Sequence, residues 1–246
     1  MNAIRRVASR HWEVAALLVF AAMVYRPWSA TALPILDFSE FFPHLRAHTW
    51  MPAQFVAVIH GMSRQGRYCP LLYAYIVTAW NLFGMWAPGW NWTYFIANSA
   101  VIILGRRFFL RIGVARAAAI AALALWSFSP AVTQSWLRPT GEPYGLLLTI
   151  TALGFAYNYA DAADWKKRAI LIAGLAFAII AAKEMLAVLL PVVWLMTRLR
   201  HADGKWSWAE WSKRDAVVFA YTFSMCILAL APVAYVALTA PPGNYA

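Results

Sequence analysis

Apolar residues occur in eight runs along the chain, and short polar segments separate one run from the next. The runs lie near residues 14–33, 70–86, 90–105, 117–134, 143–160, 169–182, 185–197 and 216–239. Each run has about the length of a helix that crosses a membrane or is buried in one. The pattern therefore predicts an all-α integral membrane protein in which residues 1–246 form a single transmembrane domain.

Composition agrees with this prediction. The chain is 63% hydrophobic, has a mean hydropathy of +0.57 and contains 13% charged residues, against roughly 25% in soluble domains. A net charge of +11 would suggest nucleic acid binding in a soluble protein. Here the basic residues cluster between apolar runs, where membrane topology places them, so we expect no nucleic acid partner.

The positive charges predict how the chain is threaded through the membrane. Of the 21 Lys and Arg residues, 15 fall in four short segments, which the positive-inside rule places in the cytoplasm. These segments are residues 1–12, 106–116, 166–168 and 198–214. All four can share one side only if an even number of crossings separates each segment from the next.

This parity decides the role of two stretches. Three apolar runs separate the first two basic segments, so one of them does not cross completely, and Pro70–Met85 is the best candidate for a helix at the outer interface. The stretch from Arg168 to Arg198 is expected to hold two short helices that meet near Lys183 and Glu184. The result is about seven transmembrane helices with a cytoplasmic N-terminus. In the alternative arrangement Pro70–Met85 crosses and the N-terminus lies outside.

The first outer loop, residues 34–88, is expected to carry amphipathic juxtamembrane helices, because Phe41, Leu45 and Phe55 stand among polar residues there. Two other segments have alternative interpretations. Val14–Val24 is interpreted as a retained anchor, the alternative being a cleaved signal peptide. Residues 204–214 predict a short cytoplasmic interfacial helix or, alternatively, a solvated loop.

The candidate functional residues come from the charged residues left on the outer side, because ionisable groups at membrane depth are costly and by default functional hypotheses. Besides Arg46, which is given no role, these are Asp37, Glu40, Arg64, Arg67, Arg138, Glu142, Lys183 and Glu184. An ion pair between the neighbours Lys183 and Glu184, or snorkelling of both side chains to the interface from short helices, is the alternative interpretation of those two. Arg64 and Arg67 could form a phosphate clamp or simply attract anionic headgroups.

Metal binding remains an alternative with weaker support. His44 and His48 have the i, i+4 spacing of one helix face and could hold a divalent cation with Asp37 or Glu40. The alternative is that both are simply exposed histidines, which an interfacial helix often carries. We prefer this alternative to a metal site. The two cysteines are far apart in sequence, with no CxxC or His spacing nearby, so neither a disulfide framework nor a zinc site is predicted.

In their order along the chain, the motifs resemble the membrane glycosyltransferases of the GT-C superfamily, which use dolichyl- or polyprenyl-phosphate sugars. That superfamily includes protein O-mannosyltransferases and the aminoarabinose transferases of lipid A. The resemblance covers most of residues 30–200 and depends on order and spacing rather than on one specific motif. The motifs are Leu36-Asp37-Phe38, Gly66-Arg67-Tyr68-Cys69-Pro70-Leu71, Leu82-Phe83-Gly84, Arg106-Arg107, Arg138-Pro139-Thr140-Gly141-Glu142-Pro143 and Ala182-Lys183-Glu184.

The resemblance implies a catalytic acid at Asp37, a second outer-loop acid at Glu142, and contacts to lipid phosphate at Arg67 and Arg64. Asp37 would accept the proton of an acceptor hydroxyl or amine, and Arg67, Arg138 or Lys183 would stabilise the departing lipid phosphate. The implied donor is a polyprenyl-phosphate-linked sugar. The implied location is a bacterial inner membrane.

Two departures from the family pattern leave other functions open. Asp37 and Glu40 are separated by Phe38-Ser39, where family members often have two adjacent acids. The chain ends at Ala246, where family members usually continue into further helices and an outer domain. A minimal or split enzyme is one expectation. A non-catalytic GT-C-like accessory subunit, bound to lipid or to partner membrane protein subunits, is the main alternative, and a transporter or channel is the third.

Overall fold

The computed structural model describes residues 2–29, 40–65, 67–133, 136, 141–157, 159, 162–202 and 205–239. Within them the chain is mostly helical, with two short strands. A helix lies in each of the eight apolar runs, so the predicted all-α class is confirmed for the described residues. Of the candidate functional residues, Asp37 and Arg138 lie outside the described residues.

Proline and glycine mark many of the helix boundaries. A proline occupies one of the first two positions of α4 (Met51–Arg64), α5 (Pro70–Phe83), α6 (Ala87–Arg111), α9 (Glu142–Ala156) and α11 (Leu190–Met196). Proline is favourable there because the first N–H groups of a helix have no intrahelical acceptor. Gly84 follows α5 with a φ of 51°, a left-handed conformation that glycine adopts without strain.

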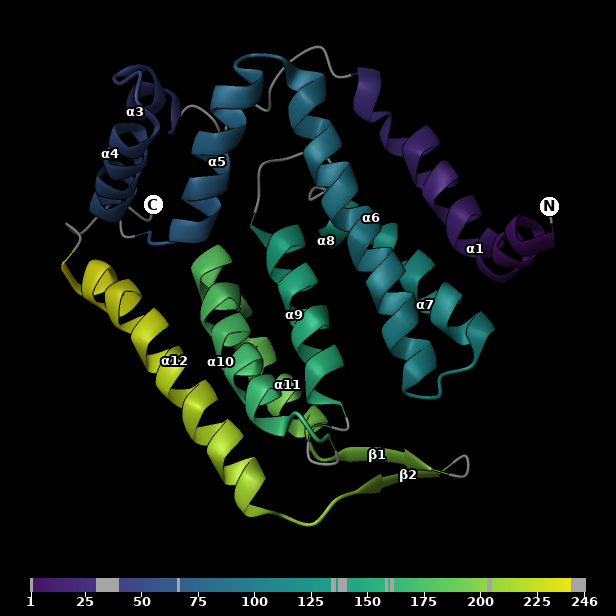
Figure 1. Ribbon diagram of the computed structural model, residues 1–246. Coiled ribbons are helices and arrows are strands. Elements are labelled where there is room, and N and C mark those ends of the chain that lie inside the picture. The colour runs from purple at the N-terminus through teal and green to yellow at the C-terminus, as the bar shows by residue number, and fades with distance from the viewer. Residues whose placement is uncertain are drawn as a thin grey trace.

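The first group of helices forms the upper part of the molecule in Figure 1. It consists of α3 (Phe42–Arg46), α4, α5 and the first turns of α6, packed around a cluster that includes Leu45, Ile76 and Trp90. α4 and α5 lie side by side, and the Asn81 amide donates a hydrogen bond to Gln54 across them. These helices correspond to the predicted juxtamembrane helices of residues 34–88.

The remaining helices form two further groups below and beside the first (Figure 1). α9, α10 (Trp165–Ala182), α11 and α12 (Lys213–Thr239) share one hydrophobic cluster. α1 (Asn2–Tyr25) and α7 (Arg116–Ser127) pack with α6 around a third. The short helices η1 (Pro27–Ser29) and α8 (Pro130–Thr133) follow α1 and α7. The boundary between the first two groups is where the candidate site lies.

The chain turns back between α10 and α11. α10 ends at Ala182, Lys183 has an extended backbone (φ −161°, ψ 113°), and the 3-10 helix η3 (Glu184–Leu189) leads into α11. α11 packs against α9, and the chain then reaches β1 at the lower end of Figure 1, where α10 begins. The prediction of two short helices that meet near Lys183 and Glu184 is therefore confirmed.

Residues 199–202 and 205–208 form the two strands of a β-hairpin, so the helix predicted within residues 204–214 is wrong for the described ones. β1 (Leu199–Ala202) pairs antiparallel with β2 (Lys205–Trp208), and Arg200 lies opposite Ser207. In β2, polar residues and tryptophans alternate with a period of two. Side chains of a strand also alternate with a period of two, and aromatic residues favour strands. Both features explain why this segment forms a strand.

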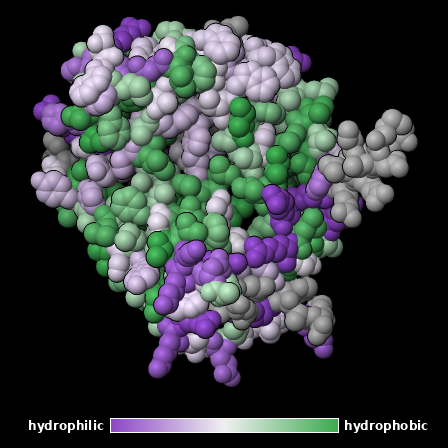
Figure 2. Space-filling model, in the orientation of Figure 1, coloured by the Kyte–Doolittle hydropathy of each residue, from purple (hydrophilic) through white to green (hydrophobic). Residues whose placement is uncertain are grey.

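Two helices of the described residues, α6 and α12, are long and apolar enough to cross a membrane. α5, α7 and the segment Glu184–Met196 are apolar but shorter. Hydrophilic residues gather at the lower end of the molecule, and hydrophobic residues form a belt above them (Figure 2). The lower end is the one that carries β1 and β2 in Figure 1.

Candidate functional site

The first turn of α9 and the last turn of α10 meet closely at Gly141. A methyl group at Gly141 would clash with the carbonyl oxygen of Ala182, the last residue of α10. The two helix ends approach this closely because glycine has no side chain. The contact brings together the next residue of each element, Glu142 and Lys183.

Glu142 and Lys183 form an ion pair, with 3.6 Å between Oε1 and Nζ. Each charge also suits its position, because a carboxylate is favourable in the first turn of α9 and a cation after the last turn of α10. The second carboxylate oxygen of Glu142, Oε2, is buried and accepts no hydrogen bond from the described residues. A carboxylate oxygen has lone pairs for such a hydrogen bond.

Glu184 faces a different partner from Lys183. The extended backbone at Lys183 sends successive side chains in different directions. Glu184 accepts a hydrogen bond from the Cys69 thiol, whereas Lys183 pairs with Glu142. The alternative prediction of an ion pair between Lys183 and Glu184 is therefore wrong for these described residues.

The Cys69 thiol is a hydrogen-bond donor to this carboxylate at neutral pH. It is 5% exposed, and burial raises its pKa to about 12, with the adjacent Glu184 carboxylate adding to the rise. A thiol that stays protonated can donate to Glu184. Sequence reasoning gave Cys69 no role, because a single cysteine before a helix carries no recognisable spacing.

A third pair contains Arg67, which lies close to Cys69 in sequence. The Arg67 guanidinium donates a hydrogen bond to Glu40, with 2.9 Å between Nη1 and Oε2. Arg67 is two residues from Cys69, which limits the separation of their backbones to about 7 Å. Arg64 is exposed and lies in the last turn of α4, three residues before Arg67. We call the six residues of the three pairs the junction site: Glu40, Arg67, Cys69, Glu142, Lys183 and Glu184.

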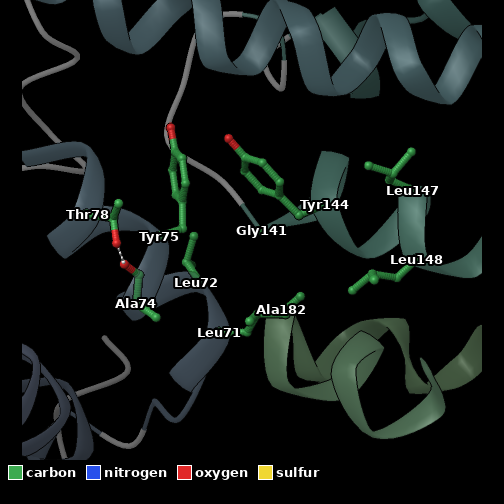
Figure 3. Close-up of a pocket in the computed structure, with 10 residues that line it drawn as sticks. All are labelled: Leu71, Leu72, Ala74, Tyr75, Thr78, Gly141, Tyr144, Leu147, Leu148 and Ala182. Carbon is green, nitrogen blue, oxygen red and sulfur yellow. Dashed lines mark hydrogen bonds between the residues drawn. The ribbon is translucent and has the colours of Figure 1, made fainter. Parts of the chain in front are cut away.

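An apolar cavity of about 390 Å³ begins where the junction site ends. Gly141 and Ala182, the residues before Glu142 and Lys183, form part of its wall. Figure 3 shows the rest of the wall, which comes from α5 and α9: Leu71, Leu72, Ala74, Tyr75, Thr78, Tyr144, Leu147 and Leu148. The cavity therefore offers an apolar space beside a group of charges.

Two tyrosines in the wall of this cavity pack against each other. The rings of Tyr75 and Tyr144 face each other across α5 and α9, with 4.5 Å between their centroids (Figure 3). Tyr75 also hydrogen bonds to Thr93 of α6 and packs edge-on against Tyr94. Sequence reasoning missed this cluster, because its members come from three separate apolar runs in which an aromatic residue is unremarkable.

The histidine pair considered for metal binding does not share a helix face. α3 ends at Arg46, so His48 lies beyond it, and the His44 ring packs directly over Gly61 of α4. The i, i+4 prediction is wrong because α3 is only 5 residues long. Among the described residues, no group of three or more His, Cys, Asp or Glu side chains is placed to hold a metal ion.

Comparison with models of known protein families, with curated proteins and with solved structures finds no match to this chain.

Proposed function

We propose that this chain is a GT-C-like glycosyltransferase that moves a sugar from a polyprenyl-phosphate carrier to an acceptor on the outer side of a membrane. The observation that carries the proposal is the junction site. Segments near residues 40, 68, 142 and 183 are far apart in sequence, yet three pairs of polar side chains link them. The residues before Glu142 and Lys183 line an apolar cavity. A polyprenyl-phosphate sugar has a charged phosphate and an apolar chain, so its binding site needs both charged residues and an apolar cavity.

The proposal includes a membrane topology. α1, α6, α7, α9, α10, the η3–α11 segment and α12 would be the seven crossings, and α3, α4 and α5 would lie in the outer layer. In that arrangement the α6–α7 turn, the start of α10 and the β-hairpin face the cytoplasm. Three of the four basic segments are found there, as the positive-inside rule requires.

The proposed reaction is a displacement at the anomeric carbon of the donor sugar. The acceptor oxygen or nitrogen forms a bond to this carbon while its proton passes to the Asp37 carboxylate. The bond from the anomeric carbon to the phosphate oxygen breaks, and its electron pair leaves with the lipid phosphate. Lys183 and Arg67, with Arg138, would stabilise the negative charge on that leaving group.

Glu142 has a separate role in this scheme. Its Oε1 holds Lys183 in place, and its buried Oε2 would accept a hydrogen bond from the acceptor or from a sugar hydroxyl. Glu40 and Glu184 hold Arg67 and Cys69 in position. The cavity between α5 and α9 would take the first isoprene units of the carrier, because its wall is largely apolar.

The test is turnover by the purified full-length chain in liposomes, with release of polyprenyl phosphate as the readout. This readout is independent of the sugar, so a panel of polyprenyl-phosphate sugars can be screened with the same assay. Asp37→Asn should abolish release while thermal unfolding stays unchanged. Normal release by Asp37→Asn would contradict the proposal. Glu210→Gln, an exposed carboxylate after β2, is the matched control.

A non-catalytic accessory subunit is the second candidate, and α12 is the observation that favours it. Phe223, Leu228, Tyr235 and Leu238 of α12 are each more than half exposed. They would face either lipid or a partner helix. Copurification of a partner membrane protein that covers α12, together with no release of polyprenyl phosphate from any donor, would favour this candidate.

A further inference from the structure

A second cavity lies between α1 and α6, at the end of these helices opposite the turn that joins α5 to α6. Its volume is about 540 Å³, and its wall has a basic part and an apolar part. The basic part consists of His11, Arg106 and Arg107, and the apolar part consists of Val14, Ala15, Leu18 and Ile103. The junction site uses none of these residues.

The basic part of this wall presents hydrogen-bond donors. Arg106 is 5% exposed, and its Nη1 lies 3.2 Å from Nδ1 of His11. A guanidinium can only donate, so Nδ1 of His11 accepts, and the ring proton is placed on Nε2. His11, which also lines the cavity, therefore carries an N–H donor. Two guanidinium groups and an imidazole N–H together favour a ligand that carries negatively charged oxygens.

The nearby carboxylate of Glu13 makes its ion pair on the α7 side. Glu13 pairs with Arg116 of α7, with 2.6 Å between Oε1 and Nε. Among the described residues, the cavity wall itself carries Arg106 and Arg107 and no carboxylate.

The apolar part of the wall indicates what else the ligand carries. Ala15 and Ile103 line the cavity and are also exposed, so the cavity opens sideways between α1 and α6. Trp12, 61% exposed, lies beside His11 on α1, as expected of an aromatic residue at a membrane interface. An opening of this kind admits a hydrocarbon chain from the bilayer. Inorganic phosphate has no apolar group that could contact the apolar part of the wall.

We propose that this cavity binds an anionic phospholipid of the cytoplasmic leaflet, with the headgroup phosphate on Arg106 and Arg107 and an acyl chain along Val14, Leu18 and Ile103. A guanidinium matches the geometry of phosphate oxygens, and anionic lipids are attracted to basic residues at this face. The lipid would fill the space between α1 and α6. The inference depends on the proposed membrane topology but not on glycosyl transfer.

The experiment measures lipid retained by the purified full-length chain in detergent, by native mass spectrometry during titration with phosphatidylglycerol. Wild type should retain phosphatidylglycerol in preference to phosphatidylcholine, and inorganic phosphate should neither bind nor compete at equal concentration. Arg107→Gln should lower the affinity roughly fivefold, as expected for loss of one basic residue at an anionic surface. Arg107 is exposed, so the variant should fold.

Two further variants distinguish specific lipid binding in the cavity from non-specific attraction of anionic lipid to the basic helix end. Arg111→Gln removes a charge from the same helix end, but Arg111 donates to the Gly154 carbonyl and is not part of the cavity wall, so affinity should not change. Ala15→Phe fills the apolar part without altering any charge and should reduce retention at least fivefold.

Equal losses in Arg107→Gln and Arg111→Gln, or full retention by Ala15→Phe, would overturn the proposal. So would competition by inorganic phosphate. Release of polyprenyl phosphate by a wild-type chain that retains no phosphatidylglycerol would overturn the lipid site alone and leave the proposed function standing.

Discussion

At the scale of single residues, Glu142 is the described carboxylate best placed to act on a bound molecule. Its Oε1 pairs with Lys183, and its Oε2 is buried without a hydrogen-bond donor among the described residues. Glu142→Gln keeps the shape of the side chain but removes the charge. We expect release of polyprenyl phosphate to fall by roughly 10- to 100-fold, the range for loss of a hydrogen bond to a charged group.

The stability of this variant should change little. The pair is partly exposed, and such pairs contribute about 0–1 kcal/mol. Thermal unfolding of Glu142→Gln alongside Glu210→Gln checks this point. A large loss of stability in Glu142→Gln alone would show that the residue supports the fold rather than the reaction.

The Cys69 thiol gives a second prediction at this scale, and it concerns pH. Burial, with the Glu184 carboxylate, raises the pKa of Cys69 from 9.0 to about 12. The folded state therefore holds this proton more tightly than the unfolded chain. The resulting stabilisation is complete below pH 9 and is lost as the pH rises toward 12.

Thiol reactivity measures this shift directly. In a Cys226→Ala background, Cys69 should react with a soluble maleimide at pH 8 at least tenfold more slowly in mild detergent than in the unfolded chain. Glu184→Ala should speed the reaction of the folded protein, because it removes a negative charge and opens the site. Equal rates in folded and unfolded protein would contradict the buried, hydrogen-bonded thiol.

Sequence alone predicted part of the junction site. Glu40, Arg67, Glu142, Lys183 and Glu184 could be named because each is a rare charge in an apolar chain, and rarity is visible in sequence. Their partners could not be named, because pairing depends on how α9, α10 and the start of α5 pack. Lys183 is the clearest case, since its sequence neighbour is Glu184 but its partner is Glu142.

At the scale of elements, the contact between α9 and α10 depends on Gly141. A methyl group there would meet the Ala182 carbonyl, which belongs to backbone and cannot rotate away. Gly141→Ala should therefore push the two helix ends apart and cost roughly 1–3 kcal/mol, the range for overpacking. Because the same contact sets the distance from Glu142 to Lys183, turnover should also fall.

Gly154 offers a matched control within α9. A methyl group at Gly154 meets nothing within 4 Å, so Gly154→Ala should be neutral or stabilise the helix by up to about 1 kcal/mol. Thermal unfolding in one detergent, measured for both variants, checks the pair. Similar destabilisation by both would show that any added methyl group on α9 is harmful and that Gly141 is not special.

Element types followed from sequence wherever an apolar run was long. A helix lies in each of the eight runs, and the break at Lys183 followed from charge parity without any glycine or proline to mark it. The β-hairpin was missed because the tryptophans and lysines around residue 206 were read as an interfacial helix. In β2 the alternation spans only four residues, so local pattern could not decide between the two.

At the scale of the whole molecule, charge is divided between two levels. The junction site lies where the upper helices, α3 to α5, meet α9 and α10, while the basic α6–α7 turn and the β-hairpin lie at the far end (Figure 1). The sequence predicted these two levels, because the positive-inside rule needs only the positions of Lys and Arg between the apolar runs. It could not show that α4 and α5 pack as a pair, since their contact joins residues such as Gln54 and Asn81.

Because α4 and α5 form one packed layer, the proposed topology makes a prediction that the alternative does not. If this layer lies outside the membrane, both of its ends are reached from the outer side. Single cysteines replacing Arg64, Met85 and Ala115, all exposed, test this in a chain whose own cysteines are changed to serine or alanine. Arg64→Cys and Met85→Cys should react with an impermeant maleimide on intact cells, and Ala115→Cys only after permeabilisation. If α5 crosses instead, Arg64→Cys would also need permeabilisation, and the outer layer, with the carboxylates that depend on it, would have to be reassigned.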